Sequence, residues 1–260
     1  MSIDEAAAPV GAGAKVGGWD AGRSGGRLVV AWQHPDSRLI SPVGFLEHGT
    51  ADGYRFRYLR RARQLEGFQP FLSFPGWERA YVSPRLFPLF AQRIMSPRRP
   101  DFRQFLHQLD LDEDATPWEQ LARSEGRSSG DTVQVFPIPT VRPDGGTTCR
   151  FLVHGIRHVN GGALPPLHPD ERLLLRDEPT NPKNSGAVRV CAPDGEPVGY
   201  VPDLLLEHLG AMRSAGPVEL VVEHVNGSEA PSHLRLLARL DGQVPEGYRP
   251  MVGPGWETFT

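Results

Sequence analysis

The sequence predicts an α+β protein with two parts, a mixed module of strands and helices followed by a small β-barrel that carries one helix. Apolar and polar residues alternate with a period of two in both halves of the chain, as is typical of half-buried strands. Helical spacing is concentrated at residues 84–122 and recurs once after residue 202. The apolar fraction of 39% is sufficient for a packed core.

Changes of composition divide the chain into five segments. Residues 1–26 are rich in Ala and Gly, which predicts a flexible tail, and they lack the basic start and apolar run of a secretory signal. A linker rich in Pro and Gly is expected at 139–147. The first module then spans 27–138, the second domain 148–241 and a C-terminal tail 242–260. We expect a cytoplasmic protein.

The first module opens with strands and continues with helices. Strands are expected at residues 28–32, 39–46 and 54–58, and again at 131–136. Residues 59–83 are interrupted by glycines and prolines and are expected to be irregular. Helices are expected at residues 84–94, 101–109 and 116–122. Pro84 and Pro117 each stand at a first helical position, where the missing N–H costs no hydrogen bond.

The second domain is rich in short strands. They are expected at residues 150–153, 172–176, 187–192, 198–201, 218–223 and 234–240. Pro193-Asp194-Gly195 predicts a turn between the third and fourth of them, because Pro fixes φ and Gly permits a positive φ. One helix is expected from Pro202 through Met212. This pattern is typical of a small β-barrel.

Composition and spacing exclude several classes of function. The net charge of −3 argues against a general binder of polyanions. Of the 28 basic residues only Lys15 and Lys183 are lysines, and neither lies in a phosphate-binding loop of the G-x-x-x-x-G-K-[ST] type. Cys149 and Cys191 have no zinc-ligand spacing, and no apolar run approaches the length of a membrane span. We therefore expect no catalytic residue, no cofactor, no metal site and no membrane contact.

The second domain resembles the HIRAN family in the order and spacing of four motifs. These are Gly155-Ile156-Arg157-His158, Glu178-Pro179-Thr180-Asn181-Pro182, Ala187-Val188-Arg189-Val190 and Gly199-Tyr200-Val201-Pro202. The resemblance implies a modified OB-like β-barrel, in agreement with the strand pattern. It also implies binding of single-stranded DNA at a 3′ end, as in the members attached to fork-remodelling helicases.

The same resemblance implies a nucleic-acid pocket built from Arg157, His158, Asn181, Lys183, Asn184 and Tyr200. Arg157 matches a position that contacts a phosphate or base, and His158 matches one that is often aromatic. Lys183 and Asn184 stand where DNA-binding members commonly carry Tyr-Asp, and Lys183 could pair with a phosphate. In the alternative interpretation Asn181 only forms a tight turn and Arg157 is a solvated edge residue. The protein is then an interaction adaptor, associated with toxin–antitoxin systems or DNA repair, whose barrel no longer binds DNA.

The first module resembles the N-terminal subdomain of HipA-type kinases. The matching stretches are residues 42–46, 54–58, 84–90, 99–102 and 121–131. The kinase core of that family is not expected, because the HIRAN-like pattern follows directly. The resemblance implies a module that contacts a protein partner, a kinase or a helix-turn-helix protein. The alternative is that it serves only as a scaffold for the second domain.

A basic run in the first module is a second candidate for nucleic-acid contact. It consists of Arg55, Arg57, Arg60, Arg61 and Arg63, interleaved with aromatic residues. Arginines beside exposed rings would form a phosphate-binding patch. In the other interpretation the rings face the core and the arginines are simply solvated.

Overall fold

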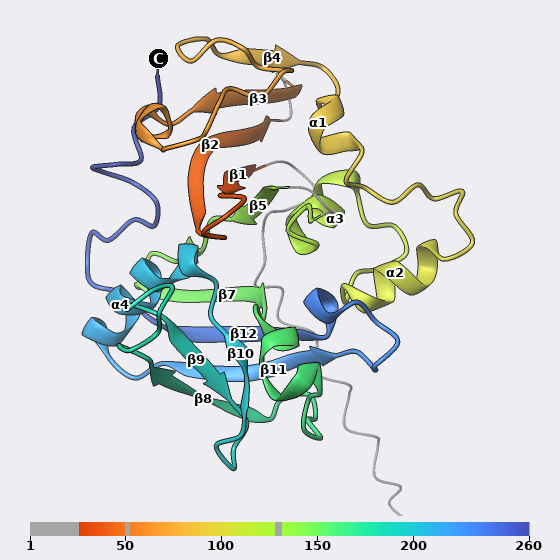
Figure 1. The fold of residues 1–260 in the computed structure, drawn as a ribbon, viewed down its shortest axis with the longest axis vertical. Helices are drawn as coiled ribbons and strands as arrows, with labels where there is room; N and C mark the ends of the chain where they lie inside the picture. Colours follow the sequence, from red (N-terminus) through yellow and green to blue (C-terminus); the bar gives the residue numbers. More distant parts are fainter. Residues whose placement is uncertain (1–25, 50–52, 128–131, 260) are drawn as a thin grey trace, which may run out of the picture.

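The computed structural model describes residues 26–49, 53–127 and 132–259. It contains two β-sheets, one from each half of the chain, which lie one above the other in Figure 1. Sheets with few, short helices confirm the predicted α+β class. The expected N-terminal tail lies, up to residue 25, outside the described residues, and Gly26 already begins the first strand.

The first sheet is antiparallel and has the strand order β4-β3-β2-β1-β5. Its strands are β1 (Gly26–Gln33), β2 (Ile40–Gly49), β3 (Gly53–Tyr58), β4 (Tyr81–Ser83) and β5 (Val133–Pro137). The predicted strands of the first module are confirmed among the described residues, while residue 131 of the strand expected at 131–136 lies outside them. Strand β4 lies at the end of the stretch expected to be irregular. One face of the sheet buries an aromatic cluster in which Phe56 and Phe74 stack with ring centroids 4.4 Å apart.

Short helices connect the strands of the first sheet. They are η1 (Arg60–Gln64), α1 (Pro88–Ala91), α2 (Phe102–Gln108) and α3 (Pro117–Arg123). Helix α3 begins as predicted, with Thr116 and Glu119 in a reciprocal capping box. Among the described residues, no helix has the length and apolar character needed to cross a membrane.

Helix α1 corrects the prediction of a helix that starts at Pro84. Pro88 would then lie inside the helix, where it has no N–H to donate and its ring clashes with the preceding turn. Phe87, the residue before it, is extended with φ −59° and ψ 144°, and Pro88 becomes the first helical residue. The helix is therefore a single turn.

The second sheet has the strand order β10-β9-β8-β11-β12-β7-β6. Its strands are β6 (Thr140–Val141), β7 (Gly146–Leu152), β8 (Arg172–Asp177), β9 (Val188–Cys191), β10 (Pro197–Tyr200), β11 (Glu219–Val225) and β12 (Leu236–Gln243). The helical segments are η2 (Ile156–His158), η3 (Asn160–Gly162), η4 (Asp203–Leu205), α4 (Leu206–Ala215) and η5 (Ser232–Leu234). Leu209 and Met212 of α4 are buried against the sheet. The single predicted helix is thus confirmed, with a 3-10 turn at its start.

The expected closed barrel is not observed in the part of the chain that the structure describes. The edge strand β10 meets the chain that follows β7 only in an isolated bridge, between Tyr200 at the end of β10 and His154 just after β7. The backbone N–H of each residue donates to the carbonyl of the other, at 3.0 and 2.9 Å. Pairing stops there because Gly155, with φ 72°, turns the chain away. A Cβ on Gly199 would stand 2.5 Å from the His154 carbonyl oxygen, so this close approach requires a glycine.

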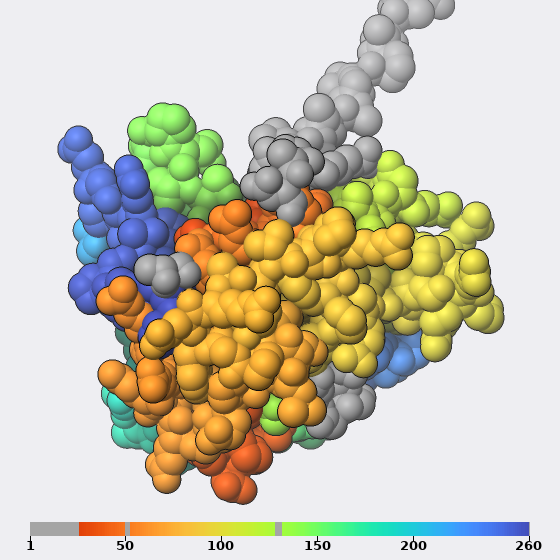
Figure 2. Space-filling view, turned by 90° about the horizontal axis from the view of Figure 1, so that it is seen from above, coloured from red at the N-terminus to blue at the C-terminus, as the bar shows by residue number. Residues whose placement is uncertain are grey.

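The two ends of the second domain are tied into the sheets. The stretch expected to be a linker, 139–147, forms β6 and pairs it with the start of β7. After β12 the chain returns to the first sheet, where Thr258 forms a bridge with Leu59. Trp256 is buried there and stacks on Phe45, with ring centroids 6.0 Å apart. Figure 1 and Figure 2 show this final segment in blue against the orange residues of the first sheet.

The two sheets are joined by a mixed apolar and polar interface. Leu109, after α2, packs in one buried cluster with Leu152 and Leu237 of the second sheet. The side-chain amide of Asn226 donates to the carbonyl of Gln108 at 2.7 Å. The modules therefore have a packed and hydrogen-bonded contact.

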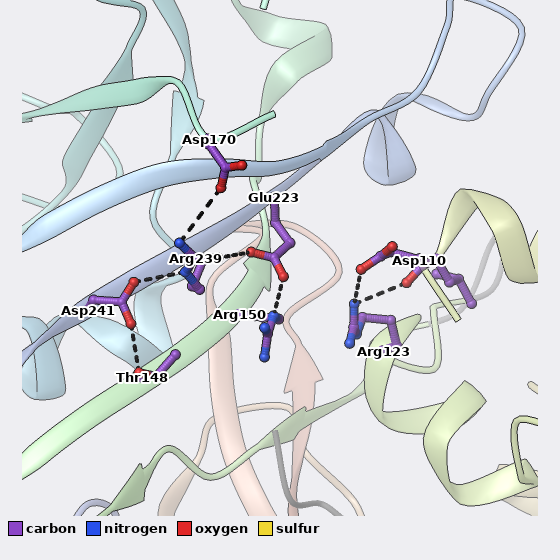
Figure 3. A network of polar contacts seen from close by, with 9 residues as sticks. Asp110, Arg123, Thr148, Arg150, Asp170, Glu223, Arg239 and Asp241 are labelled. Atoms are coloured by element: carbon purple, nitrogen blue, oxygen red, sulfur yellow. Dashed lines mark hydrogen bonds and ion pairs between the residues drawn. The ribbon is translucent and has the colours of Figure 1, made fainter. Parts of the chain in front are cut away.

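Beside this interface, a polar network lies on strands β7, β11 and β12 of the second sheet. Glu223 accepts hydrogen bonds from Arg150 and Arg239, both at 2.7 Å, and Arg239 also donates to Asp241 at 2.9 Å. Figure 3 shows Arg123 of α3 next to this network. The charged side chains of the two modules thus lie side by side here.

Candidate nucleic-acid interface

A cleft of about 690 Å³ is lined by residues of both modules. The second domain contributes all six residues of the predicted pocket, namely Arg157, His158, Asn181, Lys183, Asn184 and Tyr200. The first module contributes Gln33, Arg38, Ile40, Arg127, Thr132, Val133 and Gln134. Residues that are far apart in the sequence are thereby brought to one concave surface.

The turn after β7 presents Arg157 and His158 to the cleft. Gly155 has a positive φ and its carbonyl accepts the His158 N–H at 2.8 Å, while the buried Ile156 anchors the turn in the core. Nε of Arg157 donates to Nε2 of His158 at 3.0 Å. Burial lowers the pKa of His158, and the positive charges of Arg157, Lys183 and Arg38 lower it further. His158 is therefore neutral at pH 7 and can accept the hydrogen bond from Arg157.

The turn between β8 and β9 is organised by Asn181. Its Oδ1 accepts the backbone N–H groups of Lys183 and Asn184, at 3.0 and 3.3 Å, and its Nδ2 donates to Glu178 at 3.0 Å. This agrees with the interpretation of Asn181 as a turn residue. The consequence for the cleft is that Lys183 and Asn184 are held at its edge. Asn184 in turn donates to Oδ1 of Asp203 at 2.9 Å, which brings a carboxylate into the cleft lining.

Tyr200 provides a fixed aromatic ring. Burial and a hydrogen bond with Glu178 raise the pKa of its phenol, and the Arg189 guanidinium lies 5.9 Å from the ring centroid. Glu178 and Arg189 also form an ion pair with each other. Tyr200 carries the only six-membered aromatic ring among the lining residues in the described part of the chain. The other rings in the lining are the imidazoles of His154, His158 and His233.

The turns that follow β7 and β8, and the end of β10, all fall in one continuous segment. Residues 147–244 match the family model of the HIRAN domain. We refer to these residues as the HIRAN segment. The predicted HIRAN resemblance is thereby confirmed for this part of the chain.

Two solved structures are similar to this chain. The HIRAN domain of human HLTF is 19% identical with a TM-score of 0.31, and the match covers 44% of this chain and 100% of that one. A protein from Lactobacillus plantarum is 18% identical with a TM-score of 0.31, and the match covers 39% of this chain and 100% of that one. No curated protein matches the chain.

Residues outside the HIRAN segment complete the cleft. Arg38 lies in the turn between β1 and β2, in the left-handed conformation with φ 61°. Its N–H donates to the His34 carbonyl at 3.0 Å, and its own carbonyl accepts the Gln33 side-chain amide at 3.0 Å. A left-handed non-glycine residue costs on the order of 1–3 kcal/mol and persists only where the surroundings hold it. No sequence motif marks Arg38, and the sequence analysis missed it.

A second group that the sequence analysis missed lies where the two modules meet. Nε2 of His154, in the HIRAN segment, is 2.8 Å from a carboxylate oxygen of Glu125, which is only 3% exposed. Arg127 lies 3.9 Å from the same carboxylate. Burial lowers the pKa of the neighbouring His233 to about 4, and the positive charge of Arg127 contributes to this shift. In the described ranges, no group of three or more His, Cys, Asp or Glu side chains is arranged to hold a metal ion.

The cleft carries a local excess of positive charge in an acidic chain. Four arginine and lysine side chains line it: Arg38, Arg127, Arg157 and Lys183. The lining carboxylates are Glu178, which is paired with Arg189, and Asp203, which accepts from Asn184. The chain as a whole has a net charge of −3. The cleft is therefore the place where an anionic ligand is favoured.

None of the five arginines of the predicted basic patch lines the cleft. The rings of Phe56 and Tyr58 are fully buried, as in the interpretation with solvated arginines. Several of the arginines serve contacts within the protein: Arg57 pairs with Glu47 at 3.0 Å, Arg60 donates to the Thr258 carbonyl at 3.2 Å, Arg61 covers Trp256 at 4.3 Å, and Arg63 lies 3.6 Å from Glu78. Arg55 is exposed on β3. Four of the five arginines therefore contact the C-terminal segment or nearby acidic side chains.

Proposed function

We propose that the protein binds the ends of single-stranded DNA in the cleft formed by the HIRAN segment and the first module. The observation that carries this proposal is the convergence of four cationic side chains and one fixed aromatic ring on a single concave surface. Phosphates pair with the cations, and a base stacks on Tyr200. The family match of residues 147–244 supports this ligand class.

The proposed recognition of a 3′ end rests on Asp203 and Asn184. The two side chains are joined at 2.9 Å and both line the cleft. A carboxylate accepts a hydrogen bond from a terminal hydroxyl, whereas it repels a terminal phosphate. DNA-binding members of the family commonly carry Tyr-Asp where this chain has Lys183-Asn184. In this protein the carboxylate near that position would come from Asp203 instead.

The proposal is tested by measuring fluorescence anisotropy with oligonucleotides labelled at the 5′ end. A strand with a free 3′-hydroxyl should bind more tightly than the same strand with a 3′-phosphate. Affinity should also fall as salt rises, because phosphate contacts release counterions. Equal affinity for both strands would contradict recognition of the end, and no binding of either would overturn the proposed function.

We also propose that the protein acts by binding rather than catalysis, and that the first module contacts a protein partner such as a kinase or a helix-turn-helix protein. The absence of a phosphate-binding loop from the sequence supports the first part. Purified protein incubated with ATP should release no phosphate, alone or with DNA. Turnover that depends on this chain would contradict it.

A second candidate function is an interaction adaptor that does not bind DNA. It is favoured by one observation, the exposed apolar side chains on the edge strand β4 and in the loop before it. Val82 on the edge strand β4 is 59% exposed and Leu72 is fully exposed at 100%. The DNA-binding assay separates the two functions, because an adaptor leaves the anisotropy of both oligonucleotides unchanged.

A further inference from the structure

We infer that Arg38 of the first module is a phosphate contact for the bound strand, so that the ligand is held between the two modules rather than by the HIRAN segment alone. This inference rests on the proposed function. It assigns a binding role to a residue that lies far in sequence from the HIRAN segment, in the turn between β1 and β2.

The turn that carries Arg38 is built to present it. Nδ1 of His34 accepts the backbone N–H groups of Asp36 and Ser37, at 3.2 and 3.3 Å. The amide of Gln33 fixes the Arg38 carbonyl at 3.0 Å. These bonds hold the backbone in the left-handed conformation and leave the Arg38 side chain exposed along the cleft.

Three cations from three different segments converge at this end of the cleft. Arg157 comes from η2, Lys183 from the turn after β8, and Arg38 from the first module. The positive charges of all three act on the ring of His158 and oppose its protonation. Like charges that gather on one surface repel each other, and a phosphate between them removes that repulsion.

The position of Arg38 relative to the HIRAN segment is fixed by contacts that cross between the modules. Glu125 and the cleft-lining His154 form one of them, and Asn226 and Gln108 form another. The bridge between Leu59 and Thr258 ties the C-terminal segment to the first sheet. Arg38 is therefore part of a preorganised site, which lowers the entropy cost of binding.

The test replaces Arg38 with glycine in the full-length protein. Glycine adopts a positive φ readily, so Arg38→Gly removes the side chain while the turn keeps its conformation. Thermal unfolding of Arg38→Gly should therefore match or exceed that of the wild type. The conservative variant Arg38→Lys keeps the charge. The control is Arg98→Ala, which removes one exposed positive charge of the same module outside the cleft lining.

The readout is the affinity for a 5′-labelled oligothymidylate with a free 3′-hydroxyl, measured at several salt concentrations. Arg38→Gly should bind about tenfold more weakly, with a salt slope smaller by about 0.7, the share of one phosphate on a single strand. Arg38→Lys should restore most of the affinity, and Arg98→Ala should bind like the wild type.

The two possible failures can be told apart. If the wild type binds and Arg38→Gly binds equally well, the inference about Arg38 is overturned while the proposed function stands. Equal weakening by Arg38→Gly and Arg98→Ala indicates a general effect of charge, and it also overturns the inference. If the wild-type protein does not bind the strand, the proposed function fails and the inference fails with it.

Discussion

The carboxylate of Glu125 lies 2.8 Å from Nε2 of His154, so one buried pair joins the end of α3 to the strand end that borders the cleft. His154 also forms the backbone bridge with Tyr200 that connects the chain after β7 to the end of β10. The aromatic ring proposed to stack on a base and the contact between the modules therefore depend on the same short segment.

Removal of the Glu125 carboxylate should destabilise the protein. Glu125→Ala leaves the His154 ring nitrogen without its buried partner, which should lower the free energy of unfolding by about 1–3 kcal/mol. Urea denaturation measures this loss. Glu125→Gln keeps an acceptor of the same size at the same backbone conformation and should lose less. Equal stability of Glu125→Ala and the wild type would contradict a joining role for this pair.

The ring of Tyr200 should contribute more to DNA binding than its hydroxyl. Stacking of one base on an aromatic side chain is worth about 1–3 kcal/mol, so Tyr200→Leu should weaken binding of a single strand by roughly 5- to 150-fold. Tyr200→Phe keeps the ring and should stay near the wild-type affinity. Anisotropy titrations of the three proteins decide the matter, and loss of binding in both variants would point to the hydroxyl instead.

DNA affinity should rise as the pH falls through the range in which His158 titrates. Its pKa is lowered from 6.5 by burial and by the charges of Arg157, Lys183 and Arg38, so that His158 is neutral at pH 7. A bound phosphate offsets those charges and favours the protonated ring, and binding then takes up a proton. The affinity for DNA should be several-fold higher at pH 5.5 than at pH 7.5.

The matched variant for this pH effect is His158→Gln. It should have a flatter pH profile, whereas the contribution of His233 is common to both proteins. Parallel profiles for the wild type and His158→Gln would show that His158 does not face the phosphate.

The stability of the fold should depend on pH through His208. This ring is 2% exposed, lies 3.1 Å from the Thr147 hydroxyl, and has its pKa lowered by burial from 6.5 to about 4. Between these values the unfolded chain binds more protons than the folded one. The contribution of the neutral His208 ring to the free energy of unfolding is therefore complete above pH 6.5. As the pH falls below this value, the free energy of unfolding decreases by up to about 1.4 kcal/mol per pH unit.

Urea denaturation at pH 7 and pH 5 tests this dependence. His208→Leu should show a smaller drop in stability between the two pH values than the wild type. His233, whose pKa is also lowered to about 4, titrates in the same window and should leave a residual slope. An unchanged slope in His208→Leu would rule out a contribution from this ring.

Local pattern was sufficient to predict most elements of the fold. Alternation in residues 54–58 predicts β3 because one face of that strand is buried, and Thr116 with Pro117 predicts the start of α3 because capping is a local interaction. The long helix expected from Pro84 was wrong because Pro88 cannot stand inside a helix, so the helix begins only at Pro88. The closed barrel was not predictable from strand count, since closure depends on whether His154 and Tyr200 extend their pairing.

The part of the candidate site that lies in the HIRAN segment was predictable in its main residues, whereas the part from the first module was not, because it is distant in sequence. Arg157 and Tyr200 belong to the motifs that carry the resemblance, and Lys183 directly follows one of them within the HIRAN segment. Arg38 and Arg127 reach the same cleft only because the first module packs against that segment, and no local pattern encodes this contact. The HipA-like resemblance of the first module, with its implied partner, stays a prediction.

If the protein binds as proposed, the end of a single strand lies in the cleft beside Tyr200. Photo-crosslinking locates that end, with 4-thiothymidine as the 3′-terminal nucleotide and mass spectrometry to identify the attached peptide. We expect attachment to peptides that contain Tyr200 or the 155–158 and 181–184 turns, together with loss of the crosslink in Tyr200→Leu. Attachment to the arginine-rich residues 55–63, or an undiminished crosslink in Tyr200→Leu, would contradict it.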